Sequence, residues 1–173
     1  GPIDLIHQAT GLTDTRLFDE AARHAGNSVE PIAPRPGQPK PDHSLEVRRI
    51  LDACMPLAGT PGEAYLHARG LSDPGALDLL FHPDLADFDG RRGWPGLVAV
   101  PRQADGSLAG GIHRSFLLED GSAKAPPGKK MLGTVKDAVV RLYPMPEDGH
   151  IGIAEGIETA LAAHAQFGTA VWA

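Results

Sequence analysis

Apolar residues recur at helical spacing in the first 70 residues and change to strand-like runs after Trp94. The helical spacing predicts two short helices within residues 3–26 and a longer one within 44–57. A fourth helix begins after Thr60, which forms an S/T-x-x-E capping box with Glu63, and its first residue is a proline. Gly70 falls just past its expected end, so the sequence gives both boundaries of this helix.

The second half of the chain carries the strand signals. Two apolar runs in "GLVAVPRQADGSLAGGIHRSFL" flank the turn dipeptide Asp105-Gly106, and they predict a β-hairpin. A further strand is predicted over 137–143, "DAVVRLY". Residues 151–154, 157–167 and 170–172 then read as strand, helix and strand, a βαβ unit whose two strands are parallel and whose crossover is right-handed. The predicted fold class is therefore α/β, or α+β overall.

Prolines crowd the stretch "PIAPRPGQPKP" at residues 31–41, which predicts an extended linker. It separates the first helices from the rest, so we divide the chain into 1–26, a Pro-rich linker over 27–43, a subdomain over 44–143 and a final unit over 144–173.

Only one cysteine occurs among the 173 residues, which excludes internal disulfides and cysteine-based zinc ribbons. No apolar run is long enough to span a bilayer and no signal peptide precedes Ile3, so we expect a cytoplasmic protein with no membrane partner.

Charge is distributed unevenly along the chain, whose formal net charge is −6. Residues 91–141 carry 9 basic and 4 acidic side chains, whereas residues 142–173 carry 4 acidic and no basic ones. A basic stretch inside an acidic chain is typical of a surface that binds a polyanion while carboxylates gather elsewhere, and equally of a solvated surface without a partner.

Glu155 stands directly after the strand of the predicted βαβ unit, where ligands of open α/β sheets bind. Gly156 leaves room for a ligand to approach the backbone. Glu155 is therefore a candidate site residue, with stabilisation of the following helix terminus as the alternative. Glu158 lies in the first turn of that helix, and we interpret it as a capping residue that complements the helix dipole.

The segment "IGIAEGIETALAAHAQFGTAVWA" resembles the first strand, helix and second strand of a Toprim domain, the unit shared by bacterial-type primases, topoisomerases and related nucleases. Upstream pieces resemble the primase branch in the same order. Residues 3–26 resemble the helical tail behind the zinc ribbon of primases, and residues 52–71 a segment of phage and plasmid primase-like proteins. The stretches "DGSLAGGIHRSFL" and "KAPPGKKMLG" resemble the basic region before Toprim, so 44–143 would be a basic primase-like subdomain and 144–173 a partial Toprim domain.

This resemblance implies a DNA primase, of the kind carried by phages, plasmids and other mobile elements, that synthesises RNA primers during DNA replication by nucleotidyl transfer. Its implied partners are single-stranded DNA template and nucleoside triphosphates, with a replicative helicase as a further candidate. Glu155 would be the catalytic carboxylate and a ligand of Mg²⁺ or Mn²⁺. The family's other metal ligands lie in an Asp-x-Asp motif after a later strand, and this sequence stops at Ala173 before any such motif. We therefore expect a piece of a longer enzyme that is inactive alone and binds no zinc.

By position, the resemblance also implies nucleic-acid or nucleotide binding by six basic residues of the region before Toprim. They are Arg114, Lys124, Lys129, Lys130, Lys136 and Arg141. Two other functions remain open: a non-catalytic single-stranded nucleic-acid-binding or regulatory module, and part of a Toprim nuclease or topoisomerase. His113, Trp94, Phe116, Trp172 and Cys54 are interpreted as packing residues.

Overall fold

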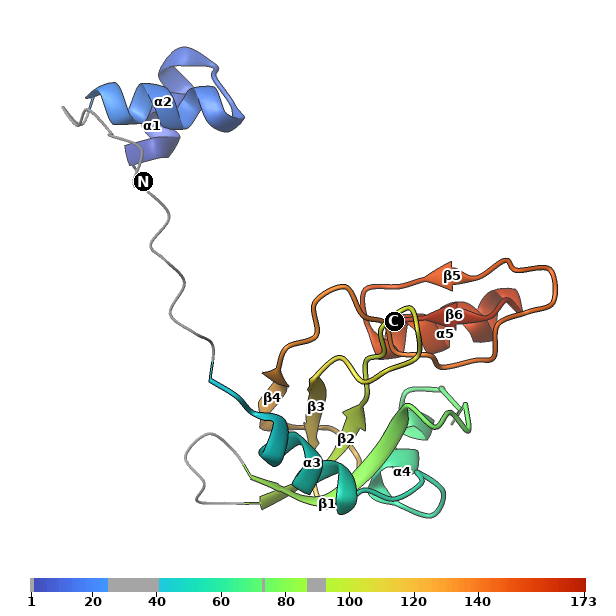
Figure 1. Cartoon of the computed structure of the whole chain (residues 1–173). Coiled ribbons are helices and arrows are strands. Elements are labelled where there is room, and N and C mark those ends of the chain that lie inside the picture. Colours follow the sequence, from blue (N-terminus) through green and yellow to red (C-terminus); the bar gives the residue numbers. More distant parts are fainter. Residues whose placement is uncertain (1, 25–40, 73, 87–92) are drawn as a thin grey trace. The chain divides into compact units, whose positions relative to one another are not determined.

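The computed structural model describes residues 2–24, 41–72, 74–86 and 93–173, drawn in colour in Figure 1. The chain divides into two compact units, Gly1–Lys40 and Pro41–Ala173. The first unit contains α1 (Pro2–Thr10) and α2 (Asp14–His24), so the prediction of two short helices is confirmed. Residues 25–40, which include most of the predicted linker and the expected helix stop at Gly26, lie outside the described residues.

The second unit begins with two helices, α3 (Ser44–Asp52) and α4 (Pro61–Ala68). The capping signals of α4 act as predicted, because the Thr60 hydroxyl accepts a hydrogen bond from the Gly62 amide and the Glu63 carboxylate accepts one from the Gly59 amide. The helix predicted over 44–57 is shorter than expected, since α3 ends at Asp52.

Four antiparallel strands form the main sheet, in the order β1-β2-β3-β4. They are β1 (Leu79–Ala86), β2 (Gly93–Ala99), β3 (Gly111–Leu117) and β4 (Lys124–Gly133). The pairing of β2 with β3 confirms the predicted hairpin. The sequence did not predict β1 or β4.

The predicted strand over 137–143 is wrong, because this segment makes only isolated bridges. Val139 exchanges backbone hydrogen bonds with Arg102, and Val140 does so with Ala173. The segment therefore crosses from the end of one sheet to the other, and its backbone groups are divided between the two.

The second sheet is small. Its strands β5 (Gly152–Ile153) and β6 (Val171–Trp172) pair in parallel, and α5 (Ile157–Phe167) connects them. Gly168 ends α5 in the left-handed conformation at a φ of 68°, as a glycine C-cap does. The predicted strand, helix and strand are thus confirmed, although both strands are shorter than expected. The chain as described is a mixed α/β structure whose principal sheet is antiparallel.

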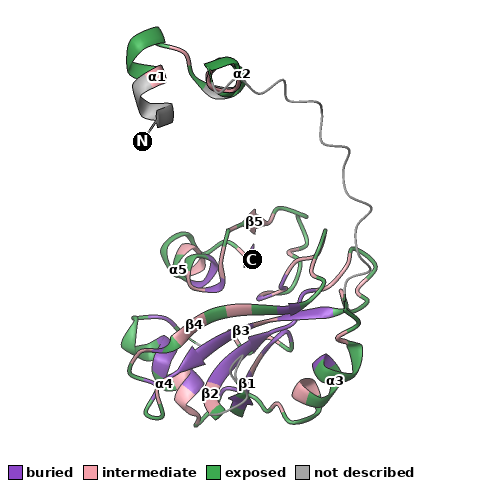
Figure 2. Cartoon of the chain, turned by 90° about the vertical axis from the view of Figure 1, so that its left-hand side faces the viewer, coloured by how far each residue is buried: buried purple, intermediate pink, exposed green. Residues whose placement is uncertain are grey.

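Each face of the main sheet supports its own hydrophobic core. On one face, Leu97 and Ala99 pack with Tyr65 of α4 and Leu161 of α5. Residues of the opposite face, such as Val98 and Ile112, pack with α3. Figure 2 shows the buried residues concentrated in β1 to β4, while the outward sides of α3 and α5 are exposed. Because successive strand residues point to opposite faces, two side chains that are neighbours in the sequence of β3 or β4 face opposite sides of the sheet.

Cys54 is half-buried beside α3, and its thiol donates a hydrogen bond to the Ile50 carbonyl. Burial raises the pKa of this thiol to about 11, which fits the predicted inert packing role. No helix in the described part of the chain has the length and apolar character needed to cross a membrane.

Gly121 offers a test of how the turn between β3 and β4 meets α4. Its φ is 71°, and a Cβ added there would lie 2.2 Å from the Pro61 carbonyl oxygen. Gly128 has a φ of 69°, but a Cβ there would meet nothing within 4 Å. We expect Gly128→Ala to lower the free energy of unfolding by about 1 kcal/mol through its backbone conformation alone. Gly121→Ala should cost about 2 kcal/mol more because the backbones must separate, as measured by urea unfolding; equal losses would contradict this close approach.

Candidate functional site

A cavity of about 370 Å³ opens where the carboxyl end of β5 meets β3 and β4. His113 of β3, Lys129 of β4 and Glu155, which follows β5, line it together with Gly156 and the start of α5. Glu155 is exposed at the end of its strand, as the sequence predicted. The cavity therefore brings the predicted carboxylate together with one of the six predicted cations.

Lys129 lies over the first turn of α5. Its Nζ donates a hydrogen bond of 2.8 Å to Glu158 Oε2, and a Cβ on Gly156 would lie 3.8 Å from the same nitrogen. The lysine side chain keeps 37% of its surface exposed. An ammonium group held in this way retains hydrogens for a further acceptor in the cavity.

Glu158 joins three elements through one carboxylate, which is a role that sequence analysis missed. Its Oε1 accepts hydrogen bonds from the Tyr65 hydroxyl of α4 at 2.9 Å and from Lys124 of β4 at 2.5 Å, and Oε2 accepts from Lys129. Burial acts to raise the pKa of Glu158, but the hydrogen bonds from Lys124 and Lys129 outweigh it and hold the pKa well below the ordinary carboxyl range. The sequence signal was only the position in the first helical turn, which does not reveal partners 29 and 93 residues away.

His113 is half-buried and shares this cavity rather than packing only within the hairpin. Burial lowers its pKa, and the nearby Lys129 ammonium lowers it further. The imidazole is therefore neutral near pH 7, with one ring nitrogen as a donor and the other as an acceptor.

The other predicted cations lie elsewhere. Arg114 and Lys130 are directly paired in the β3–β4 register, one residue away from His113 and Lys129, so they point to the opposite face of the sheet. Lys136 lies after β4 with its side chain 82% exposed, 3.7 Å from Asp137. Lys124 contacts Glu158 but does not line the cavity. Of the six basic residues that the resemblance implied, Lys129 alone is among the described residues that line this cavity.

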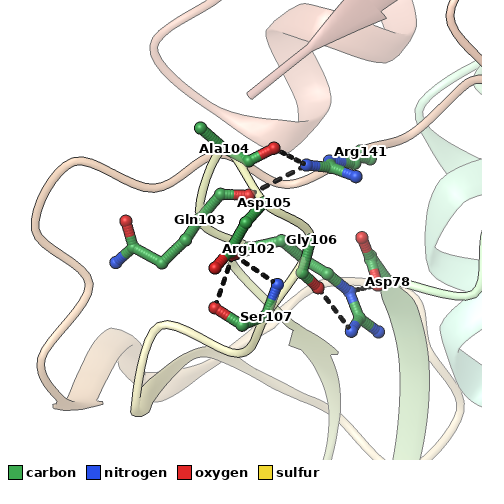
Figure 3. Close-up of polar contacts among 8 residues, drawn as sticks. All are labelled: Asp78, Arg102, Gln103, Ala104, Asp105, Gly106, Ser107 and Arg141. Carbon is green, nitrogen blue, oxygen red and sulfur yellow. Dashed lines mark hydrogen bonds and ion pairs between the residues drawn. The ribbon is translucent and has the colours of Figure 1, made fainter.

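Arg141 takes part in a polar cluster that ties the turn after β2 to the segment before β5 (Figure 3). Its Nη2 donates to the carbonyls of Gln103 and Ala104, and its guanidinium lies 5.3 Å from the centre of the Trp172 ring. In the same cluster, Arg102 Nε donates a 2.6 Å hydrogen bond to the buried carboxylate of Asp78. These contacts hold the turn in place, so Arg141 has a structural role here.

Only one carboxylate, that of Glu155, lines the cavity. Among residues 2–24, 41–72, 74–86 and 93–173, no group of three histidine, cysteine or acidic side chains is arranged to hold a metal ion.

The family model of the domain of unknown function DUF7146 matches residues 41–142. The chain therefore belongs to this family. The match covers α3, α4 and the four-stranded sheet with Lys129, and it ends before β5 and Glu155. Comparison with curated proteins gave no match, and comparison with solved structures gave none either.

The charge of Glu158 gives a test of this cluster. We expect Glu158→Gln to lower the free energy of unfolding at pH 7 by about 2–4 kcal/mol, because two partly buried lysines lose their counter-charge. The folded-state pKa of Glu158 is depressed, so its contribution is present above the ordinary glutamate pKa and is lost as the pH falls below that value toward the folded-state pKa. The difference between wild type and variant should therefore shrink in urea unfolding below about pH 4.5.

Glu147→Gln is the matched control, since Glu147 is exposed in the loop before β5. It should change the unfolding free energy by less than about 0.5 kcal/mol at either pH. If Glu158→Gln lowered the free energy of unfolding by the same amount at every pH, the packing of the side chain rather than its charge would stabilise the cluster.

Proposed function

We propose that this chain is part of a Toprim-type, primase-like protein that makes RNA primers on single-stranded DNA by metal-dependent nucleotidyl transfer. The observation that carries the proposal is the cavity shared by Glu155 and Lys129 at the carboxyl end of a parallel strand. The strand, helix and strand behind Glu155, and the resemblance of "IGIAEGIETALAAHAQFGTAVWA" to the start of a Toprim domain, support it.

The two charged groups suit phosphate chemistry in different ways. Lys129 would bind a phosphate oxygen of the template or of an incoming nucleoside triphosphate, because its ammonium faces the cavity while Glu158 holds it from behind. Glu155 would contribute one carboxylate toward Mg²⁺ or Mn²⁺, the cations that phosphoryl transfer uses. The neutral His113 supplies a hydrogen-bond donor or acceptor between them.

A single carboxylate does not make a site for Mg²⁺, which prefers several oxygen ligands in octahedral geometry. We infer that further ligands come from an Asp-x-Asp motif of the parent protein and that residues 1–173 synthesise no primers on their own. The same observation favours a second candidate, a single-stranded nucleic-acid-binding module without catalysis, since the cavity offers an anion its lysine but no complete metal site.

Lys129 should therefore contribute to binding of single-stranded DNA, measured by fluorescence anisotropy of a labelled oligothymidylate. We expect Lys129→Gln to weaken binding about fivefold at about 50 mM salt and to reduce the slope of log affinity against log salt by about 0.7, as for one lost phosphate contact. Lys136→Gln removes an exposed lysine after β4 and should change both quantities less. Equal effects of the two variants would point to unspecific charge and contradict the site.

Binding of a nucleoside triphosphate separates the two candidate functions. A polymerising site predicts that ATP with Mn²⁺ binds weakly in the cavity, and that Glu155→Gln and Lys129→Gln each reduce its affinity about tenfold in calorimetric titration. A binding module predicts that Glu155→Gln does not weaken ATP binding and can strengthen it, because a carboxylate there only repels the triphosphate. Tighter ATP binding by Glu155→Gln would therefore refute the polymerising site and leave the binding module.

A further inference from the structure

Arg114 occupies an unusual position for a cation. It lies in the middle of β3 with 5% of its surface exposed, on the sheet face that packs with α3. Its guanidinium carbon lies 5.6 Å from the centre of the Phe116 ring. The resemblance implied a basic residue facing Glu155, but alternation along β3 directs Arg114 to the opposite face from His113 and the cavity.

The guanidinium of Arg114 forms no close ion pair with the described residues, although the Glu46 carboxylate partly offsets the lowering of its pKa by burial. Its Nε is fully buried and donates to none of them. Such a group is costly, because a buried charge loses its hydration and needs compensation from an opposite charge or from good acceptors. In native proteins an unsatisfied buried donor of this kind commonly marks the place of an ion or water.

Arg114 lines a second cavity, of about 240 Å³, between the β1–β3 side of the sheet and α3. Two further donors line it. His82 of β1 is 8% exposed, and its Nδ1 accepts a hydrogen bond from the Asp84 amide, which leaves the proton on Nε2. Arg49 of α3 is exposed at the rim. Two arginines and a histidine with an N–H donor therefore line one cavity.

Two carboxylates also line this cavity and act on its donors: Glu46 raises the pKa of Arg114 and Asp84 that of His82, each against the larger effect of burial. Glu46 has a side chain 55% exposed and lies 3.1 Å from His43, outside the cavity lining. Asp84 is exposed, and its carboxylate lies against Gly93. Both charges are screened by solvent, whereas the guanidinium of Arg114 is not, so the buried part of the cavity favours an anion.

We propose that the cavity formed by Arg114, His82 and Arg49 is a phosphate-binding site, separate from the cavity of Glu155 and on the other face of the sheet. A tetrahedral oxyanion presents several acceptors to converging N–H donors, and a guanidinium binds two of its oxygens at once. The phosphate belongs either to a single-stranded nucleic acid or to a free phosphate or phosphomonoester. The first source rests on the proposed function, whereas the site itself does not.

Thermal unfolding in sodium phosphate tests the site, with sodium chloride of equal ionic strength as reference. We expect the wild-type Tm to rise by about 3–6 °C when phosphate is about tenfold above its dissociation constant. Arg114→Met should abolish that rise. In chloride the same variant should be no less stable than wild type, because an apolar side chain replaces an uncompensated buried charge. His82→Phe, which keeps Arg114, should reduce the rise at least by half.

Lys136→Gln is the matched control, because Lys136 is exposed and lines neither cavity, and it should keep the full rise in Tm. If Lys129→Gln loses the rise and Arg114→Met keeps it, phosphate binds beside Glu155; the proposed function then survives and the second site does not. A wild-type Tm that is equal in phosphate and chloride would also refute the site.

The source of the phosphate follows from oligothymidylate binding by Arg114→Met. Weaker binding than wild type, together with the lost phosphate effect, assigns the site to a nucleic-acid backbone. Unchanged oligonucleotide affinity with a lost phosphate effect assigns it to free phosphate or a phosphomonoester. Either result supports the site, and the binding defect of Lys129→Gln tests the proposed function separately.

Discussion

The carboxylate of Glu158 holds the candidate site together. It is the common acceptor for Tyr65 of α4 and for Lys124 and Lys129 of β4, while its own backbone belongs to α5. One group of side chains therefore fixes the helix of the small parallel unit against the edge of the antiparallel sheet. Glu155 precedes the same helix by two residues, so the contact that anchors α5 also sets the position of Glu155 relative to Lys129. Two lysines share the carboxylate of Glu158, so Lys129 is not fully neutralised and can attract an anion in the neighbouring cavity.

Elements with local signals could be predicted from the sequence. The helix α4 has its Thr60 cap and its proline start, and the β2–β3 hairpin has a turn dipeptide between two apolar runs. Strand β4 was missed because "KAPPGKKMLG" contains two prolines and no regular alternation of apolar residues. Such a strand is possible because β4 lies at the edge of the sheet, where a missing backbone donor faces no partner. The apolar run 137–143 was predicted as a strand but is not one. Its backbone bonds once to Arg102 and once to Ala173, so it extends neither sheet.

The same difference between local and long-range signals explains which residues of the site could be predicted from the sequence. Glu155 could be predicted, because a carboxylate directly after a parallel strand depends only on local order. The grouping of the cations could not, because it depends on strand register. Lys129 and Lys130 are neighbours in sequence, yet alternation places them on opposite faces. Lys124 and Lys129 are five residues apart and still meet the same carboxylate, because the register of β4 shifts between them. The partners of Glu158 come from α4 and β4, which the sequence gives no means of placing beside α5.

The adjacent residues His113 and Arg114 point to opposite faces of the sheet and line different cavities. One strand, β3, supplies a side chain to each of the two cavities, so any change in its register would alter both at once. The Glu158 contacts tie β4, the partner of β3, to α5. A nucleic-acid strand that reached both cavities would have to pass around an edge of the sheet, which is formed by β4 on one side and β1 on the other. Since β4 presents Lys129 to one face and Lys130 to the other, the β4 edge places a lysine on each side of the sheet, which favours this edge for a phosphate backbone.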